Sequence, residues 1–110
     1  MRRVALWLGA AAVLAVVALA VAVRVAPTDP ARWHVDPLAA ASPGEAGVLV
    51  RPGDGDIRPE GYEMAPEALL ARLDAIIRAT PRTHAIAGSV DGGRLTYLSR
   101  SRVFGFPDYA

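Results

Sequence analysis

The chain has 110 residues, a formal net charge of +1, twelve arginines, no lysine and no cysteine. The absence of cysteine excludes disulfides, thiolate metal sites, a cysteine nucleophile and a lipid-modified cysteine. The first 26 residues carry a charge of +3 and the remaining 84 carry −2, and such a near-neutral second part argues against a general nucleic-acid binder.

The first element is an uncharged apolar run from Val4 to Val23, closed by Arg24. Twenty residues in helical form span about 30 Å, the thickness of the hydrocarbon core of a bilayer. An uncleaved membrane anchor is therefore the favoured interpretation. A cleaved signal peptide is the alternative, because the alanines at 18–20 and at 20–22 both form a small-x-small cleavage pattern.

Arginines lie on both sides of this run, at positions 2 and 3 and at positions 24 and 32. The positive charge that sets the orientation of a membrane helix is therefore nearly equal on the two sides, and only the terminal amine adds to the N-terminal side. We expect the N-terminus in the cytoplasm of a bacterium, the run in the inner (cytoplasmic) membrane, and the C-terminal part in the periplasm. The alternative is secretion to the periplasm after cleavage. The lipid bilayer is the first expected partner, with Trp7 and Trp33 at its two interfaces.

The next segment, residues 27–65, is rich in proline and glycine, which favours a juxtamembrane stalk of extended chain and turns. Only Gly47 to Arg51 is typical of a short strand there. The predicted organisation is thus a membrane anchor or signal peptide over 1–26, the stalk over 27–65, and a partial α+β domain over 66–110.

The strongest helix signal runs from Pro66 to Thr80. Proline suits the first helical position, and Glu67 suits the positive end of the helix dipole. The apolar residues follow the spacing of one buried stripe, with Asp74 off that stripe. The stripe consists of Leu69, Leu70, Leu73, Ile76 and Ile77.

Two strands are predicted after the helix, over Thr83–Val90 and Arg94–Arg102, joined by a tight turn at Asp91-Gly92-Gly93. Gly88 predicts a bulge in the first strand, and a third strand is expected to begin in the apolar stretch 103–107. The predicted fold class is α+β, an amphipathic helix packed on an antiparallel hairpin in an incomplete sheet. Its open edge predicts a protein partner or self-association.

The most site-like local cluster is His34 with Asp36. A carboxylate two residues from an imidazole could orient it for acid–base work or contribute to a metal site. No third ligand is fixed by spacing, so we predict no metal and no cofactor. The competing interpretation is a capped turn before Pro37, with His34 at the surface.

Three arginines form the second candidate, an anion-binding face made by Arg94, Arg100 and Arg102. On one strand these positions share a face, where their guanidinium groups could hold a phosphate or a carboxylate. The alternative is a solvated face, or pairing with acids such as Asp91 and Asp108.

The helix ending at Pro81, the hairpin and the stretch from Ser99 to Tyr109 together resemble the first half of the domain of unknown function (DUF) 1499 family. The segment from Ala26 to Pro37, after an apolar helix, is similar to alphaproteobacterial members. Residues Arg102 to Asp108 are the most specific part. The family has no established activity, so the resemblance implies location and fold. Its members continue with further strands and a final helix, so the chain is expected to be a truncated N-terminal part.

These features predict a membrane-anchored, envelope-facing module of unknown activity, with binding or a structural role favoured over catalysis. The alternative is an enzyme acting on a small anionic substrate through His34 and Asp36, or through the arginine face. Whether the chain is an enzyme stays open at this point.

Overall fold

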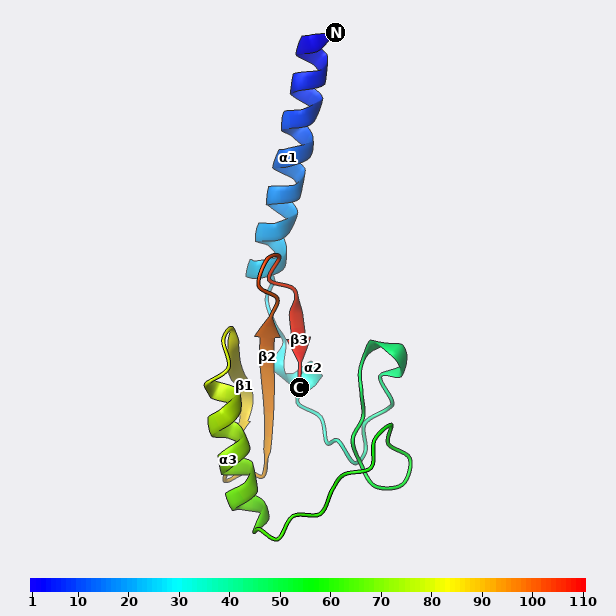
Figure 1. Ribbon diagram of the computed structural model, residues 1–110, viewed down its shortest axis with the longest axis vertical. Helices are drawn as coiled ribbons and strands as arrows, with labels where there is room; N and C mark the ends of the chain where they lie inside the picture. Colours follow the sequence, from blue (N-terminus) through cyan, green and yellow to red (C-terminus); the bar gives the residue numbers. More distant parts are fainter.

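The computed structural model describes all 110 residues as a long helix standing on a small α+β unit, with extents of 70 × 28 × 22 Å (Figure 1). The long helix comes first in the chain. Two short helical turns come next, and a further helix then leads into the sheet. The elements are α1 (Arg2–Val25), α2 (Pro30–Trp33), the 3-10 turn η1 (Gly44–Ala46), α3 (Pro66–Arg78), β1 (Thr83–Ser89), β2 (Arg94–Arg100) and β3 (Pro107–Tyr109).

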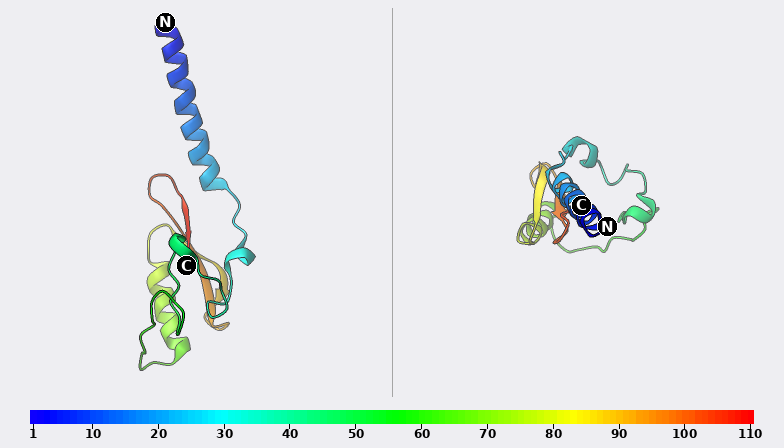
Figure 2. Two further views of the ribbon diagram at one scale, coloured as in Figure 1. Left: turned by 90° about the vertical axis from the view of Figure 1, so that its right-hand side faces the viewer. Right: turned by 90° about the horizontal axis from the view of Figure 1, so that it is seen from above.

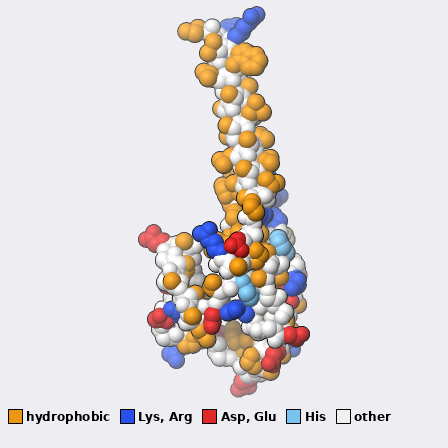
Figure 3. Space-filling view, turned by 180° about the vertical axis from the view of Figure 1, so that it is seen from behind, with side chains coloured by type: hydrophobic (Ala, Val, Ile, Leu, Met, Phe, Trp, Pro, Cys, Tyr) orange, Lys and Arg blue, Asp and Glu red, His pale blue; other side chains and the backbone are white.

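Helix α1 is the element predicted from the apolar run. It has 24 residues and no buried side chain, and an 18-residue stretch within it has a mean hydropathy of 2.6, so it is long and apolar enough to cross a membrane. A signal sequence near an N-terminus meets the same criteria of length and composition. Figure 3 shows an apolar surface along the whole rod, with basic groups gathered at its two ends. The structure is therefore compatible with a membrane anchor or a signal peptide.

The sheet has three antiparallel strands in the order β1-β2-β3, with both outer edges open. The predicted hairpin is confirmed, with a turn that includes Asp91 to Gly93. The bulge lies slightly earlier than expected, because the register shifts between Ala85 and Ala87 rather than at Gly88. Gly88 instead has a left-handed backbone, with φ of +84°. The fold class is α+β, as the sequence predicted.

The third strand begins later than predicted, at Pro107, because residues 101–106 form a loop. Gly105 has a φ of +70°, and its N–H donates to the Ser101 carbonyl at 3.1 Å. The Ser101 hydroxyl in turn accepts the Phe106 N–H at 2.9 Å. These bonds reverse the chain, so Val103 to Phe106 cannot extend along β2. The second strand likewise ends at Arg100, two residues before its predicted end.

Helix α3 packs on one face of the sheet, yet the predicted stripe is only partly covered. Leu70 and Ile77 are half-buried, whereas Leu73 and Ile76 are 48% and 67% exposed. Asp74, predicted to lie off the stripe, is instead half-buried and accepts a hydrogen bond from the Tyr97 hydroxyl at 2.7 Å. The inward face is therefore rotated, because a three-stranded sheet is too narrow to cover the whole stripe and a buried phenol needs an acceptor.

The other face of the sheet is contacted by the segment around α2. Trp33 stacks on Tyr109 of β3 with ring centroids 4.0 Å apart and planes 7° from parallel. Trp33 is thus engaged in an aromatic pair with the sheet, and Figure 2 shows α2 beside the strands. A part of the predicted stalk therefore contributes packing to the folded unit.

The remainder of the predicted stalk folds into turns around Arg51. Its guanidinium donates to the carbonyls of Pro37 and Ala40 at 3.0 and 2.7 Å and forms a salt bridge of 2.8 Å with Asp54. That hydrogen bond raises the pKa of Arg51 and lowers the pKa of Asp54. The strand predicted over Gly47–Arg51 is absent. Only a single bridge joins Val50 and Ile57, because the chain turns back at once after Pro52.

Candidate functional site

The candidate site is an open pocket of about 420 Å³ below the base of α1, which we call the arginine pocket. Its basic side chains come from three separate segments of the chain, at position 24, at 82–84 and at 100–102. No carboxylate and no apolar side chain lines it. The groups that define it are Arg24, Arg82, His84, Arg100 and Arg102.

Arg100 is placed at the centre of this region by three backbone contacts. Its backbone N–H donates to the Arg82 carbonyl at 3.0 Å. Its guanidinium Nη1 donates to the carbonyls of Val23 and Gly105, at 3.1 and 2.9 Å. The last carbonyls of a helix have no partner within the helix and carry partial negative charge, so a guanidinium is a favourable cap for them. Arg100 thereby joins the sheet to the end of α1.

Arg24 and Arg82 approach the pocket from opposite sides. Arg24 lies in the last turn of α1 and donates to the carbonyl of Val103. The Arg24 side chain lies close to the backbone of Gly105, and this approach needs a glycine because a Cβ there would lie 2.6 Å from the Arg24 side chain. Arg82 precedes β1 with a φ of +56°, and its Nε donates to the Arg100 carbonyl at 3.1 Å. Both guanidinium groups keep further donors for a ligand.

The pocket is an uncompensated positive site. The two salt bridges of the chain join Arg51 to Asp54 and Arg78 to Asp74, and neither involves a pocket arginine. The hydrogen bonds of Arg24, Arg82 and Arg100 go to backbone carbonyls, which are neutral. Clustered guanidinium groups without carboxylates offer the donors that phosphate and carboxylate groups accept.

The predicted arginine face is only partly brought together. Arg100 and Arg102 line the same pocket, whereas Arg94 lies at the opposite end of β2, about 20 Å away at the rise of a strand. Arg94 lines a different hollow with Asp36 and Leu38, where its Nε is buried without a hydrogen-bond partner. Alternate positions on a strand share a face, so the sequence predicted that Arg94 and Arg100 lie on the same side of β2. Their separation along the strand nevertheless keeps them out of one binding site.

The other predicted cluster does not converge on a ligand. The Nδ1 atom of His34 lies 2.7 Å from the Thr96 hydroxyl, and its ring lies over Gly88 of β1. The Asp36 carboxylate accepts the Leu38 N–H at 2.9 Å, the geometry of a capped turn. Each side chain thus has its own local partner. The structure contains no group of three His, Asp or Glu side chains that could hold a metal ion.

A separate titratable pair lies between α3 and β2. Burial, followed by the hydrogen bond to Asp74, raises the pKa of Tyr97 to about 12. The same hydrogen bond, with help from Arg78, lowers the pKa of Asp74. Neither residue lines the arginine pocket, and the bond between them joins α3 to β2, so its role is to fix the helix on the sheet.

Sequence reasoning missed Arg24, Arg82 and His84 as pocket residues. Arg24 entered the sequence analysis as the end of the apolar run and as part of the charge bias around it. Arg82 follows Pro81 directly, between the predicted helix and the predicted strand, and was assigned no role. A usable signal was the spacing of Arg82 and His84 at the start of one strand opposite Arg100 and Arg102 at the end of its antiparallel partner.

Comparison with known proteins adds no family. No protein-family model, no curated protein and no solved structure matches the chain. The resemblance to the domain of unknown function (DUF) 1499 family therefore stays a prediction from the residues.

Proposed function

We propose that the chain is a membrane-anchored module of the bacterial envelope that binds a phosphate- or carboxylate-bearing anion in the arginine pocket. In this proposal α1 stays attached and crosses the inner membrane, and the α+β unit stands on the periplasmic side. The observation that carries the proposal is the arginine pocket itself, with four arginines and no acid at the end of an apolar helix. Membership of the family named above is compatible with this location.

The position of the pocket supports a role at the membrane surface. Arg24 follows the apolar run directly, so a spanning α1 puts it at the level of the lipid phosphates. Basic residues at this level are attracted to anionic lipid by about 1 kcal/mol each. Two ligands share the required chemistry, a free phosphate-type anion and a lipid headgroup.

Binding is favoured over catalysis by the kind of groups present. Arginine stays protonated, so it donates and orients but does not exchange protons. His84 is the one pocket side chain of a type that serves in acid–base catalysis, and no carboxylate lines the pocket to orient it. An enzyme acting through His34 and Asp36 gains no support from their separate hydrogen bonds.

The test uses the full chain in nanodiscs and follows its arginine side-chain resonances by NMR. Inorganic phosphate is added to discs of phosphatidylcholine, and a second sample replaces that lipid with phosphatidylglycerol. We expect saturable shifts that Arg82→Gln and Arg102→Gln each weaken at least severalfold, because each removes a guanidinium group that has no carboxylate partner. Arg72→Gln, on exposed α3, is the matched control.

The two arms separate the sources of the anion. Saturation by phosphate in phosphatidylcholine discs indicates a free anion, and shifts present only in phosphatidylglycerol indicate a headgroup. Responses that are equal in the pocket variants and in Arg72→Gln would overturn anion binding. For the anchor, carbonate-washed membranes must retain the chain with its original N-terminus, and a soluble product beginning near Val21 or Val23 would refute it.

A further inference from the structure

The loop between β2 and β3 exposes three large apolar side chains close together. Val103, Phe104 and Phe106 are 68%, 48% and 51% exposed, close together in a segment of four residues. The two phenylalanine rings lie 5.7 Å apart and tilted by 40°, so they form one apolar tip. Transferring such side chains from water to an apolar environment is favourable. We call residues 103–106 the apolar tip.

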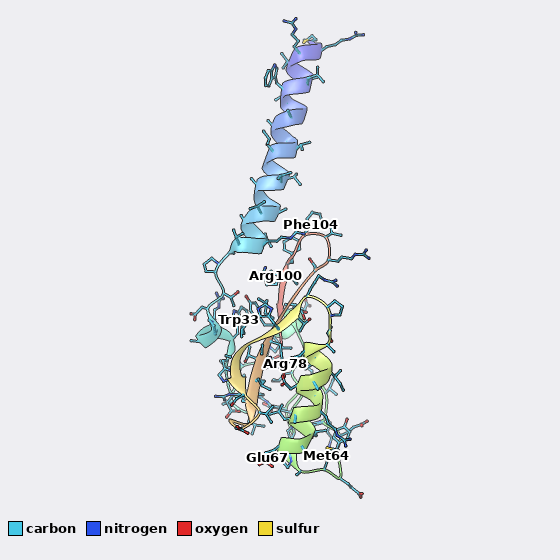
Figure 4. The ribbon with its side chains drawn as sticks, turned by 90° about the vertical axis from the view of Figure 1, so that its left-hand side faces the viewer. Trp33, Met64, Glu67, Arg78, Arg100 and Phe104 are labelled. Carbon is cyan, nitrogen blue, oxygen red and sulfur yellow. The ribbon has the colours of Figure 1, made fainter.

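The apolar tip lies against the last turns of α1. Phe104 and Phe106 line a wholly apolar pocket of about 130 Å³ together with residues of the helix. These helix residues are Val16, Leu19, Ala20 and Val23. Figure 4 shows Phe104 and Arg100 near the base of α1, whereas Glu67 and Met64 lie at the far end of the unit.

Backbone contacts fix the tip in this place. Arg24 donates to the carbonyl of Val103, and Arg100 donates to the carbonyl of Gly105 at 2.9 Å. The loop is also closed on itself, since Ser101 donates to the Phe106 carbonyl at 3.0 Å. The rings of Phe104 and Phe106 therefore lie against α1 while the polar backbone of the tip is held by the arginines.

The depth of these contacts follows from the helical rise. If Val23 marks the edge of the hydrocarbon core, Leu19 lies about 6 Å inside it and Val16 about 10 Å inside it. Side chains that share a pocket with these residues reach the same level. An apolar tip with flanking arginines is the pattern of an interfacial membrane contact, in which the rings enter the acyl region and the guanidinium groups stay with the headgroups.

We infer that the apolar tip inserts into the periplasmic leaflet beside α1 and gives the α+β unit a second attachment to the bilayer. The inference rests on the proposed crossing of the membrane by α1. The occupant of the surface is lipid, because the tip is continuous with the apolar surface of α1 and the arginine pocket lies directly behind it. Two attachments hold the unit in one orientation, with the arginine pocket at the depth of the lipid phosphates.

The test takes advantage of the absence of cysteine, since each introduced cysteine carries a single spin label. The full chain is placed in phosphatidylcholine vesicles with labels at Val103→Cys or Phe104→Cys. Val13→Cys marks the centre of α1. Val48→Cys is the matched control, because Val48 is 63% exposed on a loop away from the helix. Collisions with oxygen and with a water-soluble nickel chelate report depth.

We expect the labels at 103 and 104 to collide with the nickel chelate severalfold less often than the label at 48, and with oxygen more often. If the label at 13 is protected from the chelate but the labels at 103 and 104 are fully accessible to it, the inferred insertion of the tip is wrong, while the proposed crossing of the membrane by α1 still holds. Chelate access at 13 would instead overturn the anchor itself. Spin–spin broadening at 103 that grows with the ratio of protein to lipid would assign the tip to a second copy of the chain, against the inference.

Discussion

Tyr97 and Asp74 show how one hydrogen bond decides the orientation of a helix. Tyr97 is 5% exposed, so its hydroxyl is removed from water and must find an acceptor within the protein. Asp74 supplies that acceptor from α3 and is also held by Arg78 at 2.8 Å. A carboxylate on the inward face of an amphipathic helix is thus explained by a phenol on the strand beneath it.

The first prediction concerns the pH dependence of stability through this pair. The folded pKa of Tyr97, about 12, lies above its ordinary value of 10.0, so its stabilisation is complete below pH 10 and is lost as pH rises toward 12. The folded pKa of Asp74 lies below its ordinary value of 3.8, so its stabilisation is present above that pH and is lost as pH falls through the lowered value.

Two variants separate these effects in chemical denaturation followed over pH. Tyr97→Phe is expected to lower stability at neutral pH and to abolish the alkaline decline. Asp74→Asn is expected to remove part of the acid decline. Tyr62→Phe is the control, because Tyr62 is 63% exposed and lies outside α3. Phenolate absorbance showing that Tyr97 ionises near pH 10 would contradict the prediction.

At the scale of elements, the contact between the α2 segment and β1 depends on the lack of a side chain at Gly88. A Cβ there would overlap the Arg94 carbonyl and lie 2.7 Å from Cε1 of His34. The same residue has a φ of +84°, which only glycine adopts at no cost. The ring of His34 can therefore rest on the strand and reach the Thr96 hydroxyl.

The second prediction is that Gly88→Ala destabilises the unit by more than the backbone strain alone. The left-handed backbone costs a non-glycine residue about 1–3 kcal/mol. Gly93→Ala is a matched control, since Gly93 has a φ of +75° but no atom within 4 Å of a Cβ. Urea unfolding of both variants measures the difference. Equal losses in the two variants would show that the close approach of His34 contributes nothing.

At the scale of the whole molecule, the unit has a very small core. The buried side chains are those of Leu49, Thr96, Tyr97 and Leu98, and no large side chain is fully buried. Both edges of the sheet are open, and α3 leaves Leu73 and Ile76 exposed. Domains of this size rarely gather enough core without a disulfide or a metal.

The third prediction is that residues 27–110 without α1 do not form a stable monomer. Removing α1 leaves the apolar tip in water and deprives Arg100 of the Val23 carbonyl. We expect a broad, weakly cooperative thermal transition and association through an open strand edge. Calorimetry and sedimentation, compared with the full chain in nanodiscs, check this. A sharp melt of a monomer would show that the prediction is wrong.

The sequence by itself determined the elements whose signals are local. An uncharged run of twenty residues has only one conformation that satisfies its backbone in an apolar medium, so α1 followed directly. Pro66, the apolar spacing and Pro81 delimited α3 to within two residues, because proline acts on its immediate neighbours. The turn at Asp91 to Gly93 predicted the hairpin for the same reason.

Only the tertiary structure decided which distant residues meet. The arginine pocket joins Arg24 to residues near position 100, and the Arg100 to Val23 contact spans 77 positions of chain. Such contacts depend on how α3 and the α2 segment pack on the two faces of the narrow sheet. Local residue spacing does not encode this packing, because it depends on which side chains can be buried together and on which buried polar groups find hydrogen-bond partners.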